Sequence, residues 1–128
     1  MPLVAHVSDI HVRGLSRHAE HRAAFRELLE HCRSRSVDSI VITGDSWHSK
    51  SQGLTPEAVD LIATFFKDAA DVAPVHIMLG NHDLNLQNMS RMDALSPIID
   101  AIGSKRIMLH KHSCVHPLVC RGKDGEPD

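Results

Sequence analysis

The sequence predicts an α/β protein in which a parallel β-sheet is covered by helices. Three observations lead to this fold class: short apolar, β-branched runs typical of buried strands, longer segments with apolar residues at helical spacing, and the alternation of the two. The predicted order is βαβαβαβ within residues 1–110 of the 128. Consecutive parallel strands are joined by right-handed crossovers. Ligands of such sheets bind beyond the carboxyl ends of the strands, so function is sought in the residues that follow each strand.

The strands are predicted from short apolar runs with clear ends. Leu3–Ser8 ends in polar residues, and Ser39–Thr43 is β-branched and bounded by Gly44. Val75–Leu79 is the third such run, and Arg106–Leu109 is the fourth. We expect all of them to pair in one sheet, because a helical pattern separates each from the next.

The helices are predicted from apolar spacing and from their end signals. The first extends from His18 to about Arg33, and its apolar face is formed by Phe25, Leu28, Leu29 and Cys32. The second begins with Thr55 as N-cap and Pro56 at the first helical position. The third opens at Ser96 and Pro97, and Gly103 is expected to end it.

Composition and charge exclude several classes of protein. The chain has 14 basic and 16 acidic residues, so it lacks the overall positive charge typical of nucleic-acid binding, although a local basic rim is compatible with this balance. Three Phe, one Trp and no Tyr argue against a base-stacking module. Three cysteines without a C-x-x-C pair predict a reducing compartment rather than a disulfide scaffold. No apolar run approaches the roughly 18 residues that span a bilayer, so we expect a soluble cytoplasmic protein.

Histidines are abundant, at 11 of 128 residues. His18 and His21 are three residues apart on the first helix, where we expect a solvated polar face rather than a metal site. A second group alternates along the chain and would share one face of a strand, as in a zinc site: His110, His112, Cys114 and His116. We favour an ill-ordered tail over residues 111–128, because such a cluster lacks a second ligand pair.

Polar motifs follow three of the predicted strands. They are Ser8-Asp9-Ile10-His11, Gly44-Asp45-Ser46-Trp47-His48 and Gly80-Asn81-His82-Asp83. Ligands of the Asp, His and Asn types together suit Mn²⁺, Fe²⁺ or Zn²⁺. A carboxylate between two ions about 3.5–4 Å apart can bridge them, which is the arrangement used for in-line attack on phosphate esters. Each motif alone is weak, but the three in order at strand ends predict a metal site.

The series D-x-H, G-D-x-x-H and G-N-H-D resembles the calcineurin-like metallophosphoesterase superfamily. Within it, the runs Ser8–Arg13, Gly44–Lys50 and Leu79–Leu86 are most similar to the Mre11/SbcD DNA-repair nucleases, in their phage-type versions. The resemblance covers residues 3–110. It implies that residues 1–110 are the N-terminal part of a nuclease domain. The implied activity is exonuclease or endonuclease cleavage of DNA in repair or recombination, with two Mn²⁺ ions, in a cytoplasm that includes that of a phage-infected host.

The resemblance implies a role for each matched motif residue. Asp9 and His11 bind the first metal ion, Asp45 bridges both ions, and Asn81 binds the second. A water between the ions is the nucleophile.

The remaining motif residues are implied to act on the substrate. His82 contacts the scissile phosphate and protonates the leaving oxygen, Asp83 orients the ring of His82, and His48 positions the phosphodiester. Three basic residues on nearby loops are interpreted either as contacts to DNA phosphates or as ordinary surface charge: Arg13, Arg17 and Lys50.

The sequence departs from the family pattern near its end. The family carries a further metal-binding His and a G-H-x-H motif on later strands, whereas His110-Lys111-His112 has no preceding Gly. Two alternatives to the nuclease therefore stay open: a metallophosphatase acting on small phosphoesters, and a truncated, catalytically inactive metal-binding module. The implied partners are DNA, a second copy of the full-length chain and an SMC-like ATPase of the Rad50/SbcC type, with no membrane.

Overall fold

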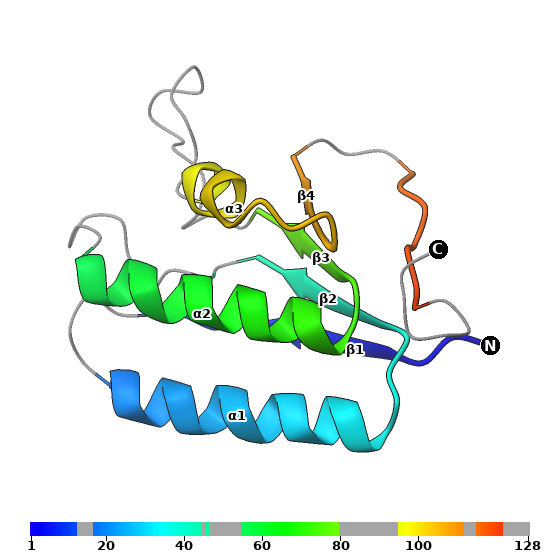
Figure 1. Cartoon of the computed structure of the whole chain (residues 1–128), viewed down its shortest axis with the longest axis horizontal. Helices are drawn as coiled ribbons and strands as arrows, with labels where there is room; N and C mark the ends of the chain where they lie inside the picture. Colours follow the sequence, from blue (N-terminus) through cyan, green and yellow to red (C-terminus); the bar gives the residue numbers. More distant parts are fainter. Residues whose placement is uncertain (13–16, 45, 47–54, 80–94, 112–114, 122–128) are drawn as a thin grey trace.

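A computed structural model shows the predicted architecture, a parallel four-stranded sheet with helices packed against it (Figure 1). The structure describes residues 1–12, 17–44, 46, 55–79, 95–111 and 115–121. The elements alternate along the chain as β1 (Val4–Ser8), α1 (His18–Ser34), β2 (Ser39–Thr43), α2 (Pro56–Val72), β3 (Val75–Met78), α3 (Ser96–Ile102) and β4 (Ile107–His110). The predicted fold class is thus confirmed.

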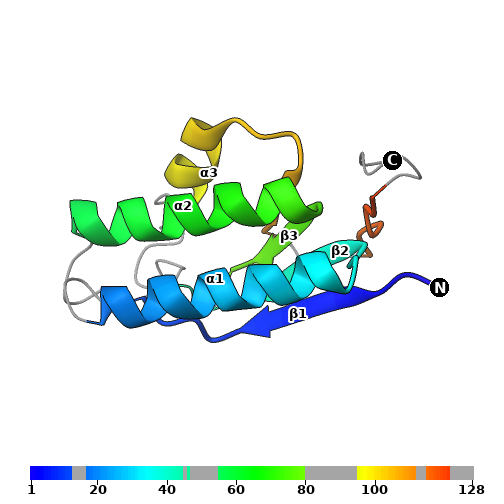
Figure 2. The same ribbon diagram turned by 60° about the horizontal axis from the view of Figure 1, so that its bottom comes forward.

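The strands lie in the order in which they occur in the sequence, β1-β2-β3-β4. Every neighbouring pair is parallel, and the register aligns Ser8 with Thr43 and Thr43 with Met78. Each crossover moves in the same direction across the sheet, so right-handed connections carry all the helices to one face. Figures 1 and 2 show α1, α2 and α3 on that same side. The carboxyl ends of β1, β2 and β3 therefore meet at one edge.

The two faces of the sheet differ in burial. Ile40, Ile42, Val75 and Ile77 point toward the helices and are at most 1% exposed. They form the core together with an apolar stripe on α2 that includes Leu61, Ile62, Phe65 and Phe66. The alternate positions of the strands lie on the opposite face, where Val4 and Met78 are more than a third exposed.

The helix ends follow the local sequence signals. The Oγ1 of Thr55 accepts a hydrogen bond from the backbone N–H of Ala58 at 3.1 Å, and Pro56 occupies the first turn of α2. Gly103 ends α3 in the left-handed conformation, with φ 67°. The predicted bounds of β2 match the observed ones, and those of the other strands differ by at most one residue at each end, as in β4, which begins at Ile107 and ends at His110.

Residues 115–121 lie against the sheet, although the sequence predicts an ill-ordered tail from residue 111. The backbone N–H of Val119 donates to Nε2 of His76 at 3.0 Å, and that of Arg121 donates to the carbonyl of Asp38 at 2.9 Å. His112 and Cys114, from the zinc-like group, lie outside the described residues. The domain boundary at residue 110 stays a prediction.

Two further expectations from the sequence concern disulfides and membrane-spanning segments. Cys32, on the buried face of α1, is a free thiol, and burial raises its pKa. None of the helices in the described ranges has the length and apolarity that a bilayer crossing requires.

Candidate active site at the carboxyl edge of the sheet

The three sequence motifs follow β1, β2 and β3, whose last residues are aligned in the sheet. Of the predicted site residues, the structure describes Asp9, His11 and Arg17. The others lie outside the described residues: Arg13, Asp45, His48, Lys50, Asn81, His82 and Asp83.

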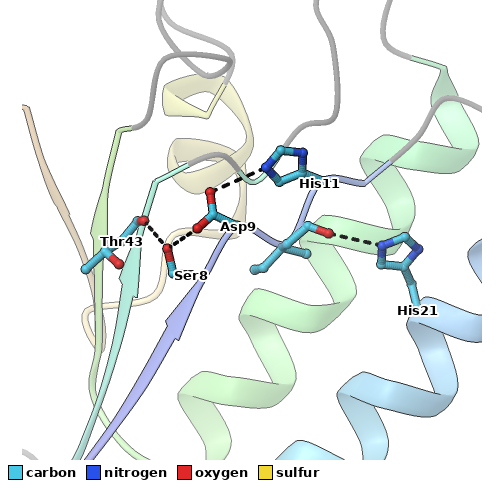
Figure 3. Close-up of polar contacts among 6 residues, drawn as sticks. Ser8, Asp9, His11, His21 and Thr43 are labelled. Atoms are coloured by element: carbon cyan, nitrogen blue, oxygen red, sulfur yellow. Dashed lines mark hydrogen bonds and ion pairs between the residues drawn. The ribbon is translucent and has the colours of Figure 1, made fainter.

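Asp9 and His11 turn their side chains toward each other just beyond the end of β1 (Figure 3). Nε2 of His11 lies 3.4 Å from Oδ1 of Asp9, and the side chains are 33% and 66% exposed, respectively. Both residues have φ 54°, in the left-handed region. This conformation is uncommon outside glycine and is often found at functional sites. The turn brings an oxygen and a nitrogen ligand from positions i and i+2 to one accessible point.

Hydrogen bonds hold the Asp9 carboxyl in its charged form. The hydroxyl of Ser8 lies 2.8 Å from Oδ2 of Asp9 and 3.0 Å from the carbonyl oxygen of Thr43, and either oxygen can accept its hydrogen bond (Figure 3). The pKa of Asp9 is lowered below its ordinary value of 3.8, mainly by the hydrogen bond from Ser8 and to a smaller extent by that from His11. A carboxylate must be deprotonated to bind a metal ion, so Asp9 is ready to do so at neutral pH.

A hydrogen bond between backbone groups connects the segment that follows β1 to the segment that follows β2. The N–H of Val12 donates to the carbonyl of Ser46 at 2.8 Å, and both residues are buried. Gly44 has φ 81°, which turns the chain directly after β2, as the sequence predicts. Thr43, two residues before Asp45, and Ser46, directly after it, are thus each hydrogen bonded to the segment that carries Asp9 and His11.

His21 is the residue near this site that sequence reasoning missed. We expected it on a solvated face of α1, but the structure half-buries it and places both ring nitrogens against backbone carbonyls. Nε2 lies 3.1 Å from the oxygen of Ile10, and Nδ1 lies 3.0 Å from that of Arg17. The spacing along α1 contains no signal for this, because Ile10 lies in the loop before the helix.

A hollow of about 320 Å³ opens beside His11. Its lining includes Arg17 and Glu20, whose side chains form an exposed ion pair with Nη2 and Oε2 at 2.8 Å. Exposed pairs of this kind contribute about 0–1 kcal/mol. Breaking this pair so that Arg17 could bind a phosphate group would therefore cost little free energy.

Asp9 and His11 fit a divalent metal ion as part of a ligand set. Two ligands about 2.1 Å from one ion, at a tetrahedral angle, lie about 3.4 Å apart, and the His11 Nε2 to Asp9 Oδ1 distance is 3.4 Å. The part of the chain that the structure describes holds no group of three or more His, Cys, Asp or Glu side chains able to bind a metal. The other predicted ligands, Asp45 and Asn81, lie outside that part.

Comparison with known proteins gives two results. The family model for calcineurin-like phosphoesterases matches residues 2–122, nearly the whole chain. "Uncharacterized protein R555" of Acanthamoeba polyphaga mimivirus is 45% identical over 100 residues. That match covers 76% of this chain and 7% of the viral protein, so the chain spans a small part of this relative.

Proposed function

Because the chain belongs to the calcineurin-like phosphoesterase family, we propose that it is a DNA nuclease that uses two Mn²⁺ ions to hydrolyse phosphodiester bonds. Metal-dependent phosphoester hydrolysis is the chemistry of the family. The observation that carries the proposal is the Asp9 and His11 pair, with its 3.4 Å separation, at the carboxyl edge of the sheet. Manganese, DNA and the Mre11/SbcD type are our more specific inferences from the motifs.

In the proposed site, Asp9 and His11 hold the first ion, Asp45 bridges both, and Asn81 holds the second. The register supports this assignment, because the strand ends that precede the three motifs are neighbours in the sheet. The hydrogen bonds that join Thr43 to Ser8 and Ser46 to Val12 support it further. Bound ions of this kind supply charge stabilisation and an activated water.

The protein's own side chains complete the chemistry that we propose. His82 donates a proton to the leaving oxygen, Asp83 orients that ring, and His48 positions the phosphodiester. Three basic residues are proposed to contact the DNA phosphates: Arg13, Arg17 and Lys50. Arg17 is supported by its position at the hollow beside His11.

A polymeric substrate suits the openness of the described part of the site. The Asp9 side chain is 66% exposed, so a phosphodiester can approach it from solvent. A phosphodiester within DNA carries nucleotides on both sides and needs an accessible position. A second copy of this protein and an ATPase of the Rad50/SbcC type are the partners that we propose.

The test compares three substrates with Mn²⁺ present: linear DNA, plasmid DNA and p-nitrophenyl phosphate. We expect DNA cleavage that is abolished by Asp9→Asn and retained by Asp71→Asn, a matched change at an exposed position on α2. Activity on p-nitrophenyl phosphate alone would replace the nuclease with a metallophosphatase. Mn²⁺ binding in a calorimetric titration, without hydrolysis of any of the three substrates, would identify the inactive metal-binding module.

A further inference from the structure

We propose that His21 is a positioning residue that fixes the loop carrying Asp9 and His11 through hydrogen bonds from its imidazole ring. The anchoring of the loop is supported by the contacts of the two ring nitrogens of His21. Its effect on metal binding rests on the proposed function, in which Asp9 and His11 are ligands.

The ring of His21 acts on the peptide unit between the two ligand residues. Nε2 lies 3.1 Å from the carbonyl oxygen of Ile10, and this carbonyl belongs to the peptide bond that joins Ile10 to His11. The Ile10 carbonyl lies in the same peptide plane as the N–H of His11. A hydrogen bond that holds this carbonyl therefore also restrains the orientation of the His11 backbone. The N–H of Val12, on the other side of His11, is held by the carbonyl of Ser46 at 2.8 Å. The backbone is therefore fixed on both sides of His11.

The loop needs such anchors because its backbone is strained. Asp9 and His11 both have φ 54°, in the left-handed region that residues other than glycine adopt at a cost. Such conformations persist only where surrounding contacts hold them. A loop freed from His21 would relax toward ordinary backbone angles and would separate the two side chains.

The chemistry of the two contacts defines what His21 must supply. Carbonyl oxygens only accept hydrogen bonds, and the second ring nitrogen, Nδ1, lies 3.0 Å from the carbonyl of Arg17. A neutral imidazole donates one of these bonds, and the imidazolium donates both. In either form that makes the Ile10 contact, the proton is on Nε2.

The ring is itself held by the core. His21 contacts the ring of Phe25, with centroids 5.8 Å apart. Phe25 stacks on Phe65 of α2 at 4.0 Å, and Phe65 is 2% exposed. This series of contacts connects the loop after β1 to the buried side of α2, so His21 positions the loop relative to the rigid part of the fold.

The test separates the hydrogen bonds of His21 from its packing. His21→Phe keeps a ring against Phe25 but removes both ring nitrogens, whereas His21→Gln restores an N–H donor. His31→Phe is the matched control, because His31 is exposed near the other end of α1. Mn²⁺ affinity is measured by calorimetry, and amide hydrogen exchange of residues 8–12 is measured on the metal-free protein.

We expect His21→Phe to weaken Mn²⁺ binding about tenfold, the lower end of what loss of a partner behind a metal ligand costs, and to accelerate exchange in residues 8–12. His21→Gln should recover part of both effects, and His31→Phe should change neither. Unchanged affinity and exchange in His21→Phe would overturn the inference.

A second measurement uses the unmutated protein and so does not depend on the folding of a variant. The ¹⁵N spectrum of the His21 ring should show a proton on Nε2, and a bare Nε2 would overturn the inference. If the unmutated chain binds no Mn²⁺, the proposed function fails, while the exchange data and the ring spectrum still decide whether His21 anchors the loop.

Discussion

The stacked rings of Phe25 and Phe65 should contribute a measurable pair energy to the packing of α1 on α2. Their centroids are 4.0 Å apart and their planes are inclined by 17°, and Phe65 is 2% exposed. Aromatic pairs contribute about 0.5–1.5 kcal/mol beyond the burial of their surfaces. We therefore expect Phe25→Leu and Phe65→Leu to be coupled by about 1 kcal/mol, within that range.

The assay is a double-mutant cycle on the free energy of unfolding, measured by urea denaturation with circular dichroism. Leucine is used rather than alanine, because removal of a whole buried ring costs about 3–5 kcal/mol and would take much of the stability of a small domain. A control cycle pairs Phe25→Leu with Ile77→Val, a buried change on β3. If the two phenylalanine variants are additive within about 0.3 kcal/mol, the stacking argument is refuted.

Three other changes test separate parts of the structure. Thr55→Ala removes the acceptor for the N–H of Ala58 and should lower the free energy of unfolding by about 1 kcal/mol, with Thr55→Ser restoring it. The pKa of His110 is lowered below its ordinary value of 6.5, mainly by burial and to a smaller extent by the charges of the neighbouring His116 and His76. The unfolded chain then binds the extra proton, so stability should fall as the pH drops through 6.5 and be regained above it, and His110→Gln should weaken this dependence in urea titrations at several pH values. Ser8→Ala removes a hydrogen bond to Asp9 and should raise the pKa of that carboxyl toward 3.8, seen as a higher midpoint in a ¹³C titration. An unchanged midpoint would remove Ser8 from this role.

The elements that could be predicted from sequence are those with local causes. Thr55 and Pro56 mark the start of α2 because a side-chain acceptor and a fixed φ act within one turn. Gly103 marks the end of α3 because the left-handed conformation there suits a residue without Cβ. The site edge could also be predicted, since it follows from strand polarity and not from the packing of any side chain.

The features that could not be predicted depend on contacts between distant segments. His21 receives its role from the path of the loop at Ile10, which precedes α1. A histidine inside a strand, such as His76, is expected to be hydrogen bonded or partly buried, and the fold buries it to 3% exposure; its partners could not be predicted. There its Nδ1 lies 2.9 Å from Nε2 of His110, and its Nε2 accepts from Val119. The donor and acceptor pattern of these rings exists only after β4 and residues 115–121 have taken their places.

The agreement between strand order and sequence order has a consequence for synthesis on the ribosome. Each strand pairs with the strand made just before it, so its partner has already left the exit tunnel when it emerges. Chains leave the ribosome N-terminus first. The sheet can then grow by addition at one edge, with α1 and α2 closing over it in turn, and none of the four strands that the structure describes has to be inserted between two earlier ones.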